Sequence, residues 1–179
     1  MSKTGGEALV ESIKAKGVEV VFGIPGVQLY HLMDAFYKHP DIKFIITRHE
    51  QGAAYMADGY ARASGKEGVC VVVPGPGLLN ASAAIGTAYS ASSPVLVLTG
   101  QINKEFIGHE GGELHEIHEQ LDVMKPITKS AERVMDASQI EAAVERTVAV
   151  LQRGGQSFVV YGEPQSGKTE FKEGKGKTF

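Results

Sequence analysis

The fold is decided by the stretch Ile42-Lys43-Phe44-Ile45-Ile46-Thr47-Arg48-His49-Glu50-Gln51-Gly52-Ala53-Ala54-Tyr55-Met56-Ala57-Asp58-Gly59-Tyr60-Ala61-Arg62. Its first part, 42–47, is almost wholly apolar and predicts a buried strand, and the part after it predicts a helix whose small residues allow close packing. Glu50 therefore falls at the carboxyl end of a strand, where ligands bind in open parallel α/β sheets. We predict that Glu50 is a buried catalytic carboxylate. The alternative is an acid in the first turn of a helix, favoured there by the helix dipole.

Helices and strands alternate along the rest of the chain. Predicted strands cover 18–22, 42–47, 69–73, 95–99, 129–134 and 157–161, and predicted helices cover 6–16, 28–37, the segment after 48, 78–91 and 138–152. Several of the strands are nearly continuous apolar runs, as expected when helices cover both faces of a sheet. The pattern predicts an α/β fold, a three-layer sandwich with a mainly parallel sheet flanked by helices.

The C-terminal third of the chain is less regular. Residues 102–125 predict an irregular loop followed by a short helix, and Ser138 is expected to cap the last helix, with Glu141 at the capping-box position. Residues 166–179 are rich in Gly, Lys and Glu without apolar periodicity. We therefore assign 1–165 to one domain and 166–179 to a flexible tail or truncated linker.

Composition and charge argue against nucleic acid and membrane as partners. The 179 residues carry a formal net charge of -3, and no basic stripe indicates a nucleic-acid surface. No apolar run approaches the ~20 residues of a membrane-spanning helix, so we expect a cytoplasmic protein without membrane contact. The single cysteine, Cys70, lies inside an apolar strand, which favours a buried core thiol over a nucleophile.

Further motifs follow the other predicted strands. These are Val21-Phe22-Gly23-Ile24-Pro25-Gly26, Pro74-Gly75-Pro76-Gly77-Leu78-Leu79-Asn80 and Thr99-Gly100-Gln101. With Arg48-His49-Glu50, they resemble the pyrimidine-binding domain of thiamine-diphosphate enzymes of the acetolactate synthase and 2-oxoacid decarboxylase group. Their order and spacing agree with that family from about Gly5 to Tyr161, and several ordered motifs are far more specific than one glycine-rich loop.

The resemblance implies roles for individual residues. Glu50 would hydrogen-bond the aminopyrimidine ring of thiamine diphosphate and activate the cofactor, which acts as nucleophile and electron sink. The implied cofactor-binding residues are Pro25, Gly26, Glu50, Pro74, Gly75, Gly77 and Asn80, with Gln101 and His115 on the substrate side. Two alternative interpretations stay open. Any strand-to-helix turn uses Gly and Pro, and Asn80, Gln101 and the histidines also fit the description of ordinary surface groups.

The chain departs from the family at one point. Acetolactate synthases usually show an Ala-Phe-Gln-Glu-like sequence where this chain has Glu113-Leu114-His115-Glu116, which leaves the 2-oxoacid open. His49 and His115 can serve proton transfer or hold a substrate carboxylate, since imidazole titrates near neutral pH. His109, His115 and His118 do not form the HExxH zinc pattern, so we predict no metal site in this chain.

The resemblance also implies a missing half. Complete relatives bind the diphosphate through Mg²⁺ in a domain with a Gly-Asp-Gly motif, which this sequence lacks. We expect the chain to be inactive without a diphosphate-binding domain or subunit, to expose an apolar patch around Glu50 and to form a homo-oligomer. FAD is possible in the complete enzyme.

Two other functions remain as alternatives. The same fold can serve as a noncatalytic dimerisation or regulatory module in which Glu50 has no chemical role. The sequence Gly162-Glu163-Pro164-Gln165-Ser166-Gly167-Lys168-Thr169 satisfies the P-loop formula after a predicted strand. The residues after Thr169 have little apolar face and include glycines, so a phosphate-binding helix is not expected there and we interpret the match as accidental.

Overall fold

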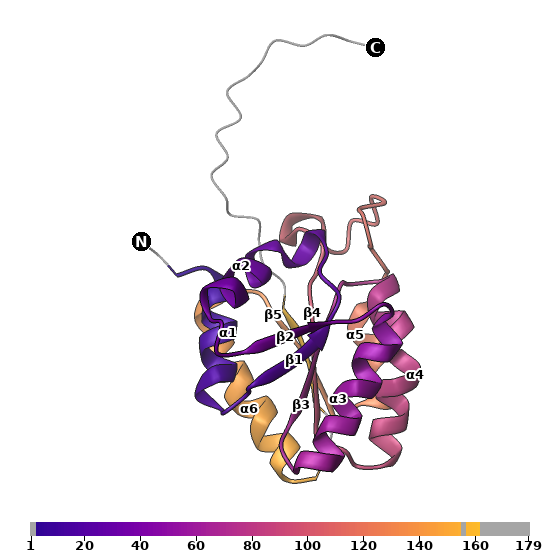
Figure 1. The fold of residues 1–179 in the computed structure, drawn as a ribbon. Coiled ribbons are helices and arrows are strands. Elements are labelled where there is room, and N and C mark those ends of the chain that lie inside the picture. The colour runs from indigo at the N-terminus through magenta and orange to yellow at the C-terminus, as the bar shows by residue number, and fades with distance from the viewer. Residues whose placement is uncertain (1–2, 155–156, 162–179) are drawn as a thin grey trace, which may run out of the picture.

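A computed structural model describes residues 3–154 and 157–161 of the chain. Its centre is a six-stranded sheet in the order β2-β1-β3-β4-β6-β5, and every neighbouring pair of strands is parallel (Figure 1). The strands are β1 (Val20–Gly23), β2 (Lys43–Ile46), β3 (Gly68–Val72), β4 (Val95–Thr99), β5 (Ser130–Val134) and β6 (Ser157–Tyr161). The predicted parallel α/β sheet is confirmed.

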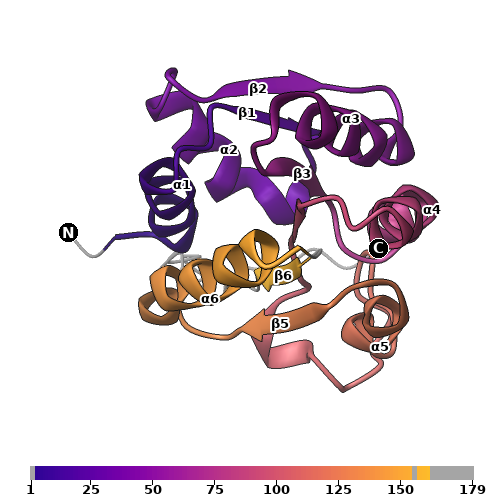
Figure 2. The same cartoon turned by 90° about the horizontal axis from the view of Figure 1, so that it is seen from below.

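Helices cover both faces of the sheet (Figure 2). One face carries α1 (Gly5–Ala15), α2 (Tyr30–Lys38) and α6 (Ile140–Gln152), and the other carries α3 (Glu50–Ser64), α4 (Pro76–Ser90) and α5 (Gln120–Met124). Short 3-10 turns are η1 (Val27–Leu29), η2 (Lys104–Phe106), η3 (Lys125–Ile127) and η4 (Ala137–Gln139). In the described part of the chain, no helix combines the length and apolar character needed to cross a bilayer.

Each face of the sheet has its own apolar core. Along β3, whose five residues are all buried, Val69 and Val71 pack with α1, α2 and α6, whereas Cys70 and Val72 pack with α3 and α4. Burial raises the pKa of the Cys70 thiol to about 12, so it stays protonated at neutral pH. The prediction of a core thiol is confirmed.

The close packing expected of the helix after Glu50 is also present. Ala53, Ala57 and Ala61 of α3 are buried in the same core as Ala81, Ala84 and Ala88 of α4. Small side chains on both surfaces let the two helix axes approach each other. A methyl group at Gly68 would lie 2.0 Å from the carbonyl oxygen of Ala57, so α3 also lies close to the start of β3.

The prediction that 42–47 is buried on both faces is wrong. β2 is an edge strand, and its side chains are mostly accessible, with Ile46 68% exposed and Ile45 37% exposed. The apolar run marks a strand correctly, but periodicity does not show whether a neighbouring strand or helix covers it. This edge keeps an apolar surface in the isolated chain.

The start of the last helix also differs from the prediction. Asp136, not Ser138, is the cap: its carboxylate accepts a hydrogen bond from the Ser138 backbone N–H at 2.8 Å and begins the 3-10 turn η4. The α-helix then starts at Ile140, so Glu141 is not in a capping box. Asp and Ser both favour the N-cap position. Because this helix begins with a 3-10 turn, its cap lies two residues earlier than predicted, at Asp136.

The direction of the connections gives the sheet a topological switch point. From β1 the chain runs through α2 to β2 on one side, and from β3 it runs through α4 to β4 on the other. Because these connections diverge, the carboxyl ends of the adjacent strands β1 and β3 form the topological switch point, the usual ligand site of such sheets.

The P-loop match at 162–169 and the predicted domain boundary at 165 lie outside the described residues.

The first helix gives a pH-dependent test of stability. Thr4 and Glu7 form a reciprocal capping box, and hydrogen bonds from the Thr4 backbone and from Lys38 lower the pKa of Glu7 from 4.5 to about 2. Because the folded-state pKa is depressed, this contribution is present above pH 4.5 and is lost as the pH falls towards 2. We expect Glu7→Gln to lower the free energy of unfolding at pH 7 and to have little effect at pH 2, measured by urea titration. Glu141→Gln, at an exposed site, should show no such convergence.

Candidate active site

Glu50 is the first residue of α3, directly after the turn that follows β2. The helix is capped by His49, whose Nδ1 accepts a hydrogen bond from the Gln51 backbone N–H at 3.2 Å. The Thr47 hydroxyl donates to the His49 carbonyl oxygen at 3.1 Å and fixes the turn. Glu50 is half-buried, so the prediction of a buried carboxylate is wrong for the chain by itself. One side of the carboxylate remains accessible to a ligand.

Asn80 holds the Glu50 carboxylate from the neighbouring helix. Its side-chain amide donates from Nδ2 to Glu50 Oε2 at 3.0 Å. Asn80 lies on α4 one turn after Gly77, and a Cβ at Gly77 would lie 3.6 Å from Glu50 Oε1. The structure therefore brings together three residues that the sequence placed at the site, with one carboxylate oxygen oriented by an amide and the other beside a glycine.

Val73, which the sequence analysis did not single out, joins the two glycine turns. A Cβ at Gly26 would lie 2.2 Å from its Cγ1, and a Cβ at Gly77 would lie 2.6 Å from its Cγ2. Both distances are far below van der Waals contact, so a side chain at either glycine would displace Val73. The turn after β1 and the turn after β3 are thereby held against one another at the switch point.

Two features of the structure favour glycine at position 75. Its φ of 57° is in the region that L side chains rarely adopt, and a Cβ there would lie 2.3 Å from the carbonyl oxygen of His115. The segment around His115 thus lies directly on the turn that precedes α4. This contact joins residues forty positions apart in the sequence and could not be found from local pattern.

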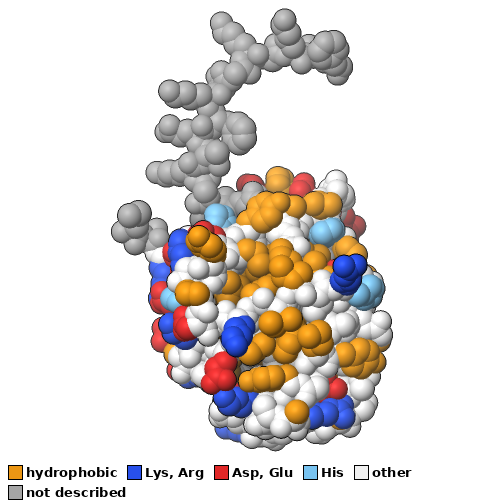
Figure 3. Space-filling model, in the orientation of Figure 1, with side chains coloured by type: hydrophobic (Ala, Val, Ile, Leu, Met, Phe, Trp, Pro, Cys, Tyr) orange, Lys and Arg blue, Asp and Glu red, His pale blue; other side chains and the backbone are white. Residues whose placement is uncertain are grey.

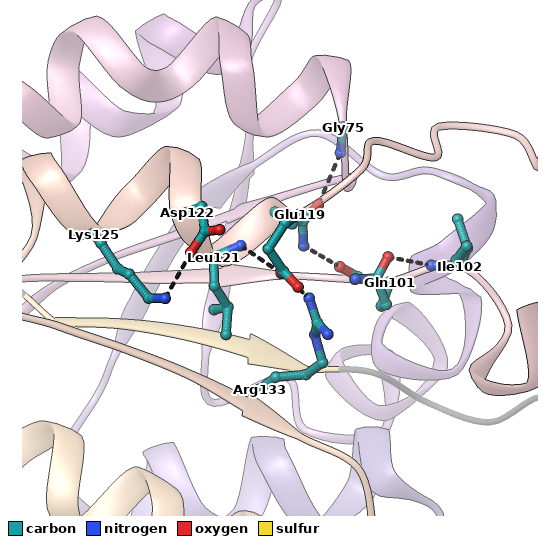
Figure 4. A network of polar contacts seen from close by, with 10 residues as sticks. Gly75, Gln101, Ile102, Glu119, Leu121, Asp122, Lys125 and Arg133 are labelled. Carbon is teal, nitrogen blue, oxygen red and sulfur yellow. Dashed lines mark hydrogen bonds and ion pairs between the residues drawn. The ribbon is translucent and has the colours of Figure 1, made fainter. Parts of the chain in front are cut away.

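Gln120 is a buried residue of the site that sequence reasoning missed. Its side chain is 1% exposed, its Oε1 accepts from the Gly75 backbone N–H at 3.0 Å, and its Nε2 donates to the Gly100 carbonyl oxygen at 3.2 Å. The amide therefore ties the turn after β3 to the end of β4. Next to it, Glu119 accepts from the Leu121 N–H and pairs with Arg133 of β5 (Figure 4).

A hollow of about 260 Å³ lies beside these turns. The half-buried Gln101 borders it and uses its own Oε1 to accept a hydrogen bond from the Ile102 N–H at 2.8 Å. The lining residues include Gln28, His31, Gln101, Phe106, Glu113 and Leu114. His115 is linked to this hollow through Gln28, with His115 Nδ1 and Gln28 Oε1 separated by 3.2 Å. Both residues predicted on the substrate side therefore lie at or next to one hollow.

The two prolines predicted to bind the cofactor, Pro25 and Pro74, lie at the turns, and no hydrogen bond links either to Glu50 among the described residues. Pro74 is buried, whereas Pro25 borders a separate apolar hollow with Phe36, Phe44 and Ile46. His118 pairs with Glu110, away from His115. Within the described ranges, no three His, Cys, Asp or Glu side chains lie close enough to hold a metal ion.

Apolar side chains are exposed on the elements that carry Glu50 and Asn80. Tyr55 and Met56 of α3 and Leu79 of α4 are each more than 40% exposed. Figure 3 shows hydrophobic side chains gathered on the face that carries β2 and α3. The expected apolar patch is present in the chain by itself.

The fold and the site together define a class of protein. A parallel α/β domain presents one oriented carboxylate between glycine turns at its switch point, which is the arrangement of a domain that binds an organic cofactor. Residues 3–125 match the model of the family described as thiamine pyrophosphate enzyme, N-terminal TPP binding domain. The chain belongs to this family.

Curated relatives agree with that assignment. The chain is 43% identical over 149 residues to a probable 2-ketoarginine decarboxylase AruI of Pseudomonas aeruginosa, an alignment that covers 82% of this chain and 26% of the relative. It is 47% identical over 125 residues to a probable acetolactate synthase large subunit of Methanocaldococcus jannaschii, covering 70% and 20%. It is 35% identical over 162 residues to the acetolactate synthase large subunit of Haemophilus influenzae, covering 90% and 28%. The chain thus spans between a fifth and somewhat more than a quarter of these relatives.

Glycine substitutions test the geometry of the turns. Gly75→Ala combines an unfavourable φ with a 2.3 Å approach to backbone, so we expect a loss of at least about 2 kcal/mol in the free energy of unfolding. Gly59→Ala is the matched control, because a Cβ at this helical position of α3 meets nothing within 4 Å. It should stabilise the protein by about 0.5–1 kcal/mol. Equal effects in urea titrations would contradict the described turn.

A second test addresses the buried amide. Gln120→Leu leaves the Gly75 N–H and the Gly100 C=O without their partner, and an unsatisfied buried polar group costs about 1–3 kcal/mol. We expect a loss of that order and faster hydrogen exchange at the Gly75 amide. Gln51→Leu, at a half-buried position on α3, should leave exchange at Gly75 unchanged. Slow exchange at Gly75 in Gln120→Leu would show that another group protects this amide.

Proposed function

We propose that this chain is the pyrimidine-binding half-site of a thiamine-diphosphate-dependent enzyme that acts on a 2-oxoacid as a carboligase or decarboxylase. The observation that carries the proposal is the Glu50 carboxylate, oriented by Asn80 at the switch point of the sheet. Because the family is described as binding thiamine pyrophosphate, we propose that this carboxylate acts on that cofactor. The proposed cofactor-binding residues are those named from the sequence.

We propose that the aminopyrimidine ring approaches Glu50 beside Gly77, where a Cβ would lie 3.6 Å from Glu50 Oε1. Gly26 and Gly77 present backbone where side chains would collide with Val73, and in the described residues Asn80 is the hydrogen-bond partner of Glu50, through Oε2. Oε1 therefore remains to share a proton with a ring nitrogen. A carboxylate oxygen can accept this hydrogen bond, whereas the ammonium group of a lysine can only donate.

When bound, the cofactor supplies the nucleophile and the electron sink for the reaction. The chain itself orients the groups that contact the cofactor. Asn80 fixes the rotation of the Glu50 carboxylate, and Gln120 fixes the turn that begins at Gly75. The hollow beside Gln101, with His115 next to it, is the proposed substrate side. A relative named as a probable 2-ketoarginine decarboxylase supports a 2-oxoacid as the substrate class.

The remainder of the active centre must come from elsewhere. We propose a diphosphate-binding domain or subunit that holds Mg²⁺ and covers the apolar surface of Tyr55, Met56 and Leu79. We propose that a half-site of this kind is inactive alone. The complete enzyme is proposed to be a homo-oligomer located in the cytoplasm. FAD in the complete enzyme is part of the same proposal, supported by the resemblance to acetolactate synthases.

The decisive variant is Glu50→Gln in the protein assembled with its diphosphate-binding partner. We expect the 2-oxoacid turnover number to fall roughly 10²- to 10⁴-fold, the range for loss of a positioned acid–base group. Assembly, followed by size-exclusion chromatography, should be unchanged because glutamine keeps the size and the contact to Asn80. Turnover is measured with thiamine diphosphate and Mg²⁺ in excess.

Glu67→Gln is the matched control. Glu67 precedes β3 at the opposite, amino-terminal edge of the sheet, so this variant should retain full turnover. Unchanged turnover in Glu50→Gln would contradict the catalytic role and favour the noncatalytic dimerisation or regulatory module.

A further inference from the structure

The side-chain amide of Gln28 has two partners on the segment that follows β4. Its Nε2 donates to the Leu114 carbonyl oxygen at 2.9 Å, and its Oε1 lies 3.2 Å from Nδ1 of His115. Gln28 belongs to the turn η1 after β1 and borders the hollow described above, so one amide links two distant parts of the site.

These contacts determine where the hydrogen of His115 lies. A carbonyl oxygen can only accept, so the NH₂ group of Gln28 must face Leu114 and its Oε1 must face His115. The amide oxygen is also only an acceptor, so Nδ1 of His115 must carry the hydrogen. In the neutral imidazole the other nitrogen, Nε2, is then bare and accepts a proton or a hydrogen bond.

Both ends of this contact are held by close backbone packing. A Cβ at Gly100 would lie 3.0 Å from Cβ and 3.0 Å from the carbonyl oxygen of Gln28, so Gln28 packs directly on the end of β4. His115 has a φ of 68°, and its backbone carbonyl lies against Gly75. The backbone is therefore closely packed at both ends of the side-chain contact.

We propose that Gln28 is a positioning residue that fixes His115 as the Nδ1–H tautomer, so that Nε2 serves as the acceptor on the substrate side. A histidine free in water prefers the opposite tautomer, with the hydrogen on Nε2, so the contact to Gln28 reverses the ordinary preference of the ring. The inference rests on the proposed function for the identity of the group that gives its proton or hydrogen bond to Nε2. The tautomer itself follows from the hydrogen bonds.

The test is nitrogen NMR of the imidazole rings in the ¹⁵N-labelled 179-residue chain, at a pH where histidine is neutral. We expect His115 to show Nδ1 as a protonated nitrogen and Nε2 as a bare one. Gln28→Leu should return His115 to the Nε2–H form or a mixture, while Gln28→Glu, which keeps an acceptor oxygen, should preserve the Nδ1–H form. Asn103→Ala, which borders the same hollow, should leave the tautomer unchanged.

A wild-type His115 with its hydrogen mainly on Nε2 would overturn the proposal, and this result does not require any variant to fold. Retention of the Nδ1–H form in a folded Gln28→Leu variant would overturn the role of Gln28. Neither readout needs cofactor or substrate, so both remain informative if Glu50→Gln leaves turnover unchanged. In the assembled enzyme, Gln28→Leu should lower the turnover number at least tenfold and Gln28→Glu should restore part of it.

Discussion

The parallel pairing of β1 with β3 places both turns of the candidate site. Phe22 pairs with Cys70 and Gly23 with Val71, and the Ile24 N–H continues the ladder to the Val71 carbonyl oxygen at 3.2 Å. Because the chain leaves these adjacent strands in opposite directions, their carboxyl ends stay uncovered by crossover helices. The glycine turns, Val73 between them and the carboxylate of Glu50 all depend on this one register.

Side-chain amides connect the turns to one another. Asn80 holds Glu50, Gln120 joins Gly75 to Gly100, and Gln28 joins the turn after β1 to the segment at His115. An amide suits this task because it donates and accepts at once without carrying charge, which makes its burial less costly than that of an ion. The turns next to Glu50 are thus joined to one another by neutral side chains.

The two faces of the Ala-rich helix α3 have different partners. Its inner face, with Ala53, Ala57 and Ala61, packs into the core shared with α4, while Tyr55 and Met56 on its outer face are exposed. Apolar surface gathered next to a proposed active carboxylate is what a half-site requires, because the same surface that binds a partner also excludes water from the reaction.

The sequence by itself determined the layered parallel fold, the strand-end position of Glu50, the core thiol and the family, because these depend on local periodicity and on ordered motifs. Local pattern misjudged the burial of β2 and the cap at Ser138, since neighbours in space and the choice between a 3-10 and an α-helical first turn set both. Gln28, Val73 and Gln120 emerged only from the tertiary structure. Their partners lie as many as 87 residues away, and only the folded sheet brings such groups within hydrogen-bonding distance.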